Sequence, residues 1–294
     1  MFHSIQELID TANKKKISIS EVMIQAEMEV TKQSREAIRQ KMEQNLEVME
    51  KAIAKGINGV KSSTGLTGGD AVKLQQYIQS GKGLSGDTIL DAVTSAIATN
   101  EVNAAMGIVC ANPTAGSAGT VPGVLFSLEK KLQLTRDEMI DFLFCAGAFG
   151  LVIGNNASIS GAEGGCQAEV GTASGMAAAA TVQVAGGTPE QSAHACAIAL
   201  QNLLGLVCDP VAGLVEIPCI KRNAAGASNA MISADIALAG VESEIPCDEV
   251  ISAMDEVGRS MPVELRETAE GGLATTKTGK RLEEKVFGTC KGCK

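Results

Sequence analysis

Aromatic rings and positive charge are both scarce in this chain. Its 294 residues include six Phe, one Tyr and no Trp, and acidic residues outnumber basic ones to give a net charge of −9. Proteins that bind nucleic acids rely on a basic surface and on rings that stack against bases. The composition therefore excludes a nucleic-acid partner, and the acidic excess itself indicates only solubility and weak long-range steering.

Secretory and membrane-spanning patterns are also missing. The first residues, MFHSIQELID, lack the basic stretch and following apolar stretch of a secretory signal. The longest uncharged apolar run, 142–154, is shorter than the roughly 18 to 20 residues that a bilayer crossing needs. We therefore expect a cytoplasmic protein with no membrane partner, in which this run forms a buried helix.

Helix signals recur along the chain. Capping-box spacings predict helix starts at three places, Ser18 with Glu21, Thr135 with Glu138, and Thr188 with Gln191. One amphipathic face, ending near Gly56 and Gly59, is indicated by Ile38, Met42, Leu46, Met49 and Ile53. Further helices are expected over residues 87–104, 136–152, 166–184, 189–206, 219–239 and 248–259. Sustained strand alternation is not found.

The composition is that of a folded chain, with 45% hydrophobic and 20% charged residues. Because rings are few, its core must consist of small and aliphatic side chains, which let helices approach closely. We predict an all-α fold, mostly helical, with a single domain over residues 1–294. No charge run marks a domain boundary, and the polar residues at about 275–294 are expected to form a flexible tail.

Four loops between the expected helices have an unusual composition. They combine glycines with hydroxyl or amide side chains and very few charges, and they cover residues 61–70, 110–123, 154–166 and 208–219. Glycine lets backbone N–H groups approach a ligand closely, and loops held by a rigid scaffold often carry function. These loops are therefore the expected surroundings of a binding site.

The chain has nine cysteines, an odd number, and it is too long to need disulfides for its stability. A reducing cytosol would not keep such disulfides in any case. Cys166, Cys208 and Cys219 each begin or end a polar glycine loop beside an expected helix, where amides and helix ends stabilise thiolates. Three dispersed cysteines suggest an iron–sulfur cluster with one iron lacking a protein thiolate, and such an iron is a Lewis acid. The alternative for each is a small buried hydrophobic residue.

The remaining cysteines fall into other contexts. Cys145 and Cys196 lie in apolar helical runs and are expected in the core, while Cys110 and Cys247 stay unassigned. The only C-x-x-C pair is formed by Cys290 and Cys293 near the end of the chain. Without a second pair it does not by itself indicate zinc, which prefers four closed ligands.

Several segments together resemble the iron–sulfur L-serine dehydratases. The resemblance is carried by GAEGGCQAEVG (161–171), GLVCDPVAGLVEIPC (205–219), SSTGLTGG (62–69), ANPTAGSAGTVPG (111–123), KRNAAGASNA (221–230) and ELRETAEGGLA (264–274). These segments span most of the chain. The sequence looks like the alpha (catalytic) chain of the two-subunit form, because no regulatory region is evident before or after the catalytic one.

The resemblance implies a cofactor, a reaction and a partner. The cofactor is an oxygen-sensitive [4Fe–4S] cluster held by Cys166, Cys208 and Cys219, with no pyridoxal phosphate. The reaction is β-elimination of L-serine to pyruvate and ammonia, as an L-serine ammonia-lyase in amino-acid degradation and gluconeogenesis. The expected partner is a separate beta subunit that completes a hetero-oligomer. The mostly helical catalytic region of single-chain relatives agrees with the predicted fold.

Candidate substrate-binding residues lie in two of the glycine loops. Ser62, Ser63, Thr64 and Gly65 could present hydroxyl and backbone donors to the substrate carboxylate, with Thr114 and Ser117 in the same pocket. The alternative is that these are turn and N-cap residues, a role in which Ser, Thr and Gly are common.

The general base that removes the α-proton stays open. His3 and His194 are the only histidines, one near the terminus and one within a helix. Lys221 is a candidate if burial lowers its pKa, although a solvated or charge-balancing lysine is the simpler interpretation. Glu163 and Glu169 flank Cys166 but could simply accept hydrogen bonds from loop amides. A group of the partner chain or a serine alkoxide near the cluster are further alternatives.

The carboxyl-terminal cysteines differ from the family pattern. In single-chain relatives a terminal cysteine can occupy the fourth iron position, whereas here Cys290 and Cys293 lie in a longer basic tail and neither is the last residue. Either remains a possible tail ligand, and a redox-sensitive C-x-x-C is the competing interpretation.

Three other functions compete with the lyase. A related iron–sulfur desulfidase acting on cysteine would keep the cluster and release sulfide. A non-enzymatic cluster-based redox sensor would keep the cluster without turnover. A purely structural helical subunit would hold no cluster.

Overall fold

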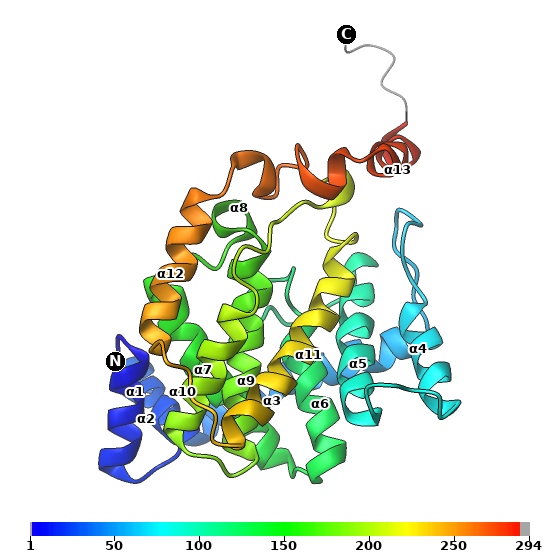
Figure 1. The fold of residues 1–294 in the computed structure, drawn as a ribbon. Helices are drawn as coiled ribbons and strands as arrows, with labels where there is room; N and C mark the ends of the chain where they lie inside the picture. The colour runs from blue at the N-terminus through cyan, green and yellow to red at the C-terminus, as the bar shows by residue number, and fades with distance from the viewer. Residues whose placement is uncertain (1, 289–294) are drawn as a thin grey trace.

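The structure is a computed structural model that describes residues 2–288 (Figure 1). The predicted all-α fold is confirmed, because these residues form helices and no strand, with one isolated bridge between Cys208 and Arg266. The α-helices are α1 (Ile5–Lys15), α2 (Ile19–Thr31), α3 (Arg35–Ile57), α4 (Asp70–Gln79), α5 (Asp87–Ala104), α6 (Thr120–Leu132), α7 (Arg136–Asn156), α8 (Gly161–Gly164), α9 (Thr172–Val184), α10 (Pro189–Gln201), α11 (Cys219–Leu238), α12 (Cys247–Ser260) and α13 (Lys277–Phe287).

The predicted caps begin the helices as expected. Ser18 accepts a hydrogen bond from the Glu21 amide at the start of α2. Thr135 and Thr188 form complete capping boxes at the starts of α7 and α10. Each cap satisfies backbone donors that the first helical turn would otherwise leave unpaired.

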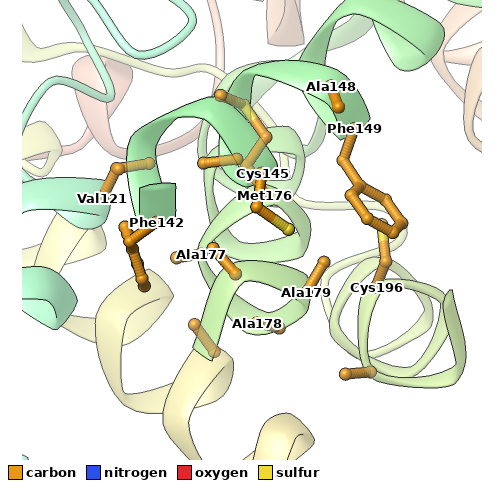
Figure 2. Close-up of a cluster of buried hydrophobic side chains, with 14 of the residues drawn as sticks. Val121, Phe142, Cys145, Ala148, Phe149, Met176, Ala177, Ala178, Ala179 and Cys196 are labelled. Atoms are coloured by element: carbon orange, nitrogen blue, oxygen red, sulfur yellow. The ribbon is translucent and has the colours of Figure 1, made fainter. Parts of the chain in front are cut away.

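The core lies around α7 and α9. Phe142, Phe144 and Phe149 of α7 are buried, which confirms that 142–154 is an internal helix, and α9 contributes the fully buried run 177–180, which consists of alanines (Figure 2). At Gly175 a Cβ would lie 2.9 Å from the Cys196 sulfur. Small residues therefore set the close approach of α9 and α10, as the shortage of rings predicts.

Two boundaries differ from expectation. Helix α6 begins at Thr120, inside the predicted loop 110–123, because the Asn223 side chain on α11 accepts hydrogen bonds from the amides of Gly119 and Thr120. Helix α10 ends at Gln201 rather than at 206, and turns follow it.

The segment expected to be a flexible tail contains a helix. In α13, Thr276 caps the helix by accepting from the Gly279 amide at 3.0 Å, and the helix contacts the short turn Val211–Gly213. The polar composition of this segment reflects a helix that lies on the surface, with only Gly279 buried.

The glycine loops meet at one end of the helix bundle. Figure 1 shows α8 and the start of α11 at this end, with the chain from α12 to α13 crossing above them. No helix among residues 2–288 is both long and apolar enough to cross a bilayer. This end of the bundle carries the candidate site.

Candidate metal centre

Three separate loops bring the predicted cysteine ligands together. Cys166 precedes a π-helical turn, Gln167–Gly171, while Cys208 lies in the connection to α11 and Cys219 begins α11. The sulfurs of Cys166 and Cys208 and a carboxylate oxygen of Glu169 lie within 4.8 Å of one another. Cys208, Cys219 and Glu169 also line one cavity of about 350 Å³, which we call the cysteine cavity.

The three thiols differ in their pKa. The pKa of Cys166 is lowered, first because the Cys208 thiol donates a hydrogen bond to it and then because Arg222 is near. The same hydrogen bond, together with burial, raises the pKa of Cys208. Burial and the neighbouring Cys166 raise the pKa of the Cys219 thiol to about 12. The geometry therefore favours one thiolate at Cys166, and a cation bound between the three sulfurs would favour deprotonation of the others.

Arg222 links the ligand loops to each other. One guanidinium nitrogen, Nη1, lies 3.5 Å from the Cys166 sulfur and donates to the Val207 carbonyl at 2.7 Å. The same nitrogen lies 2.8 Å from Oδ1 of Asp209, and the two side chains are only 15% and 4% exposed. Such a buried pair is costly to break, since removing one partner leaves the other charge uncompensated.

The segment ELRETAEGGLA (264–274) is hydrogen-bonded to Cys208 and Asp209. Cys208 donates its amide hydrogen to the Leu265 carbonyl at 2.8 Å, and its own carbonyl accepts from the Glu267 amide at 2.7 Å. Oδ2 of Asp209 accepts from the Leu273 amide at 2.7 Å. Gly272 has a left-handed φ of +56°, and a Cβ there would collide with the Asp209 carboxylate. Glycine at 272 therefore permits this contact.

Glu169 is the acidic group of the cysteine cavity. It accepts a hydrogen bond from the Thr114 hydroxyl at 2.7 Å, and burial raises its pKa. At Gly161 a Cβ would lie 2.6 Å from the Glu169 carboxylate and 3.1 Å from the Cys208 sulfur. The glycine-rich loop 154–166 thus leaves room for both groups. Loop-amide contacts were the expectation for Glu169, whereas the structure shows its carboxylate facing two candidate ligands.

Of the predicted substrate residues, Thr114 is the one that lines the cysteine cavity. Ser117 does not line this cavity, because it is fully buried, and its hydroxyl donates to the Asn112 carbonyl at 2.9 Å. The Asn223 side chain donates to the Gly116 carbonyl at 2.7 Å and to the Cys219 carbonyl at 3.0 Å. These contacts fix the loop that carries Thr114 against the start of α11.

The loop with Ser62, Ser63, Thr64 and Gly65 does not line the cysteine cavity. Ser63 is exposed, whereas the hydroxyls of Thr64 and Thr67 are engaged within the fold and donate to the buried carboxylate of Glu216 at 2.8 and 2.5 Å. Ser62 lies 3.1 Å from Thr64 and accepts from the Thr67 amide, and Gly65 donates its amide hydrogen to the Ser62 carbonyl. Glu216 precedes Cys219 by three residues, so the loop is tied to the ligand loop.

Lys221 lies at the surface. Its side chain is 71% exposed, its Nζ pairs with Asp70 at 3.2 Å, and it does not line the cysteine cavity. The structure therefore does not bring this candidate base to the sulfurs. The interpretation of Lys221 as a solvated lysine agrees with its position.

The other described cysteines lie away from this cavity. Cys145 and Cys196 are fully buried in the core as expected, and Cys247, which sequence left unassigned, is buried and hydrogen-bonded to Cys196. Cys110 is partly buried, and burial raises its pKa. Cys290 and Cys293 lie outside the described residues.

The residues of the cysteine cavity fit an iron–sulfur cluster. Three thiols converge from three loops, and a buried guanidinium lies close enough to offset thiolate charge. Cysteine thiolates are the usual ligands of such clusters, and hydrogen bonds to the sulfurs tune them. A set of three cysteines leaves one position of a four-iron cluster to another ligand.

Comparisons with known proteins identify the family of the chain. The family model for the serine dehydratase alpha chain matches residues 14–274. The chain is 68% identical over 292 residues to "Probable L-serine dehydratase, alpha chain" of Bacillus subtilis (strain 168), covering 99% of this chain and 97% of that protein. It is 44% identical over 283 residues to "L-serine dehydratase, alpha chain" of Peptoniphilus asaccharolyticus, covering 96% and 97%.

A longer relative also aligns with nearly the whole chain. "L-serine dehydratase 1" of Escherichia coli (strain K12) is 38% identical over 280 residues, which are 93% of this chain and 61% of that protein. The family match spans Cys166, Cys208 and Cys219 and the segments that position them. This chain belongs to the serine dehydratase alpha chain family.

Proposed function

We propose that the chain is an L-serine ammonia-lyase, which converts L-serine to pyruvate and ammonia by β-elimination without pyridoxal phosphate. The observation that carries the proposal is that Cys208 and Cys219 line one cavity with Thr114 and Glu169, while the Cys166 sulfur lies within 4.8 Å of the Cys208 sulfur and a Glu169 carboxylate oxygen. The names of the relatives support serine as the substrate. The three cysteines would hold a [4Fe–4S] cluster, whose open iron supplies a Lewis acid for the departing hydroxyl.

The walls of the cysteine cavity suit a small polar substrate. Thr114 presents a hydroxyl, and Ala115 and Gly116 bring backbone rather than bulky side chains to the surface. A Cβ at Gly116 would lie 3.0 Å from the Glu169 carboxylate, so glycine keeps the space in front of this group. We propose that this loop orients the substrate. The loop 62–65 remains a proposed contributor to carboxylate binding, supported by its link through Glu216 to the Cys219 loop.

We assign the removal of the α-proton to Glu169. Its carboxyl group lines the cavity and is held by the Thr114 hydroxyl, and its raised pKa makes the carboxylate a stronger base than an exposed one. Glu267 is the other carboxyl on the cavity wall, and it is exposed. Proton removal by Glu169 and hydroxide departure together complete the elimination.

The proposal includes a beta subunit in the reducing cytoplasm. Relatives of nearly the same length are named alpha chains, and the longer Escherichia coli relative contains a further region within one polypeptide. A beta chain would supply the equivalent of that region. Cys290 or Cys293 remains a proposed tail ligand of the open iron.

The test is anaerobic purification of the chain together with a beta subunit, followed by iron, sulfide and pyruvate analysis. We expect iron and sulfide in the protein and pyruvate formed from L-serine. Sulfide release from L-cysteine without activity on L-serine would indicate the desulfidase instead. A cluster without turnover would indicate the redox sensor, and absence of iron after anaerobic reconstitution would contradict the proposal as a whole.

The role of Glu169 is tested separately with Glu169→Gln and the matched variant Glu267→Gln. We expect Glu169→Gln to lower kcat by about 100-fold or more, the usual scale of general-base catalysis, while its iron content stays normal. Glu267→Gln should keep most activity because its carboxyl is exposed. Loss of iron from Glu169→Gln would show instead that the carboxylate helps to hold the metal.

A further inference from the structure

A second cavity lies on the other side of the ELRETAEGGLA segment. Arg266 and Glu267 are consecutive residues in the stretch that pairs with Cys208, yet they line different spaces. Glu267 lines the cysteine cavity, and Arg266 lines a cavity of about 460 Å³ that we call the Arg266 cavity. None of the three candidate cluster cysteines lines this second space. It is therefore a separate place for a ligand.

The Arg266 cavity has charges of both signs. Its polar lining consists of Asn155, Asn156, Ser158, Glu163, Asp255, Arg259 and Arg266. Two guanidinium groups face two carboxylates, so the lining has no net charge. The carboxylates are already oriented, because Glu163 accepts from the Ser158 hydroxyl at 2.6 Å and Asp255 accepts from the Ser158 amide at 3.3 Å.

The two arginines differ in how many hydrogen-bond and ion-pair partners their guanidinium groups have. Arg259 pairs with Asp255 at 2.7 Å and is 79% exposed. Arg266 has no carboxylate within 4.0 Å among residues 2–288, and its Nη1 makes a single long hydrogen bond of 3.4 Å to the Glu163 carbonyl. Its Nε is buried and has no partner within the same residues. The buried Nε is out of reach of a ligand, but the two Nη nitrogens of a guanidinium carry four donors, of which one is used here, so the outer end of Arg266 is suited to receive an anionic group.

We propose that the Arg266 cavity binds a small α-amino acid as a zwitterion. The ligand carboxylate pairs with Arg266, whose planar fork matches carboxylate geometry, and the ammonium group is offset by Glu163 and Asp255. A zwitterion suits this lining because it satisfies both signs of charge and adds no net charge. A simple carboxylate or a simple amine would leave one half of the lining unpaired.

The test measures binding of L-alanine to the cluster-free chain by isothermal titration calorimetry. L-alanine has no β-hydroxyl to eliminate, and the experiment does not depend on the cluster or on turnover, so its outcome is independent of the proposed lyase activity. We expect Arg266→Gln to weaken L-alanine binding by about tenfold or more, the effect of losing a charge-assisted pair. The matched variant Arg281→Gln should change binding by less than about threefold, because it removes an exposed arginine that does not line this cavity.

Two further comparisons keep the proposal open to contradiction. Acetate and methylamine should each bind at least about tenfold more weakly than L-alanine, because each offers one charge only. If Arg266→Gln fails to fold by circular dichroism, Arg266→Lys replaces it, and weaker binding is expected because lysine lacks the bidentate fork. No detectable L-alanine binding, equal binding by the Arg266 variants and wild type, or loss of binding in Thr114→Val alone would overturn the proposal.

Discussion

Two groups of three cysteines can be compared within this chain. Cys166, Cys208 and Cys219 form the loop thiols at or next to the cysteine cavity, and Cys145, Cys196 and Cys247 form the core thiols on α7, α10 and α12. All six side chains are buried. The loop thiols have a guanidinium and a carboxylate beside them. Cys145 and Cys196 instead lie among aliphatic and phenyl side chains (Figure 2), and Cys247 contacts Cys196 at the edge of a cavity that Asp248 also lines.

The comparison shows that burial alone does not mark a metal ligand. Burial raises the pKa of Cys145, and burial together with the hydrogen bond to Cys196 raises that of Cys247, so both thiols stay protonated and inert. Cys166 is equally inaccessible, yet the Cys208 hydrogen bond and Arg222 lower its pKa. The charged and polar neighbours therefore separate a ligand from a small core residue.

The largest expected effect comes from removing one thiol of each group. Cys208→Ala should lose the iron and, with it, pyruvate formation by roughly 10³-fold or more, because residues that act as a unit fail together. Cys196→Ala should retain both. Iron content and serine-dependent pyruvate formation, measured on anaerobically purified protein with the beta subunit, check this prediction. Normal iron in Cys208→Ala would remove the distinction between the two groups.

The next effect concerns the charge beside the loop thiols. Arg222→Met leaves the buried Asp209 carboxylate unpaired and should lower the free energy of unfolding by about 3–5 kcal/mol, measured by urea denaturation of the cluster-free chain. The double variant Arg222→Met with Asp209→Asn should recover part of this loss. Equal free energies of unfolding for the single and double variants would show that the unpaired Asp209 carboxylate does not cause the loss of stability.

The sequence predicted the cysteine ligands but not the groups that tune them. Cys166, Cys208 and Cys219 are recognisable from glycine-rich loops and family motifs that are local in sequence. Arg222 lies in the motif KRNAAGASNA, but the motif did not indicate its role, because that role depends on contacts with Val207 and Cys166 that only the folded chain creates. Glu169 was noted beside Cys166 in the sequence, but its place on the cavity wall depends on the π-helical turn that follows Cys166.

Helix boundaries were likewise predicted where they depend on residues close in sequence and missed where they depend on distant contacts. The capping boxes at Thr135 and Thr188 depend on side chains three residues apart, so sequence located them. The start of α6 depends on Asn223, about one hundred residues away, and it was missed. Helix α13 was missed because its polar composition resembles that of a tail, whereas its cap at Thr276 and its contact with the turn 211–213 place it on the fold.

A smaller effect is expected within the core group. Cys196→Ala removes one buried sulfur from close packing against Gly175, and should lower the free energy of unfolding by about 1 kcal/mol. Cys196→Ser should cost more, because it buries a hydroxyl in apolar surroundings. Urea denaturation of the cluster-free chain measures both, and their iron content after reconstitution should stay normal. A stabilising serine would indicate that this site is more polar than the structure shows.

The smallest effect is expected for an ion pair at the surface, in contrast to the buried pair of Arg222 and Asp209. Glu21 on α2 pairs with Arg35 on α3, and this hydrogen-bonded pair lowers the pKa of Glu21 below its ordinary value of 4.5. A carboxyl with a lowered folded-state pKa stabilises the fold above its unfolded pKa and loses that contribution as the pH falls through the folded value. Arg35 is 40% exposed, so solvent screens the pair and Glu21→Gln should cost at most about 1 kcal/mol at neutral pH.

The difference between wild type and Glu21→Gln should therefore shrink as the pH falls below 4.5. It should also shrink with added salt, which screens exposed pairs more than buried ones. Urea denaturation at a series of pH values and salt concentrations measures both dependences, with Glu47→Gln, which loses an exposed pair with Lys51, as the matched control. A loss as large as that of Arg222→Met, or one insensitive to salt, would mean that burial does not set the strength of the ion pairs in this chain.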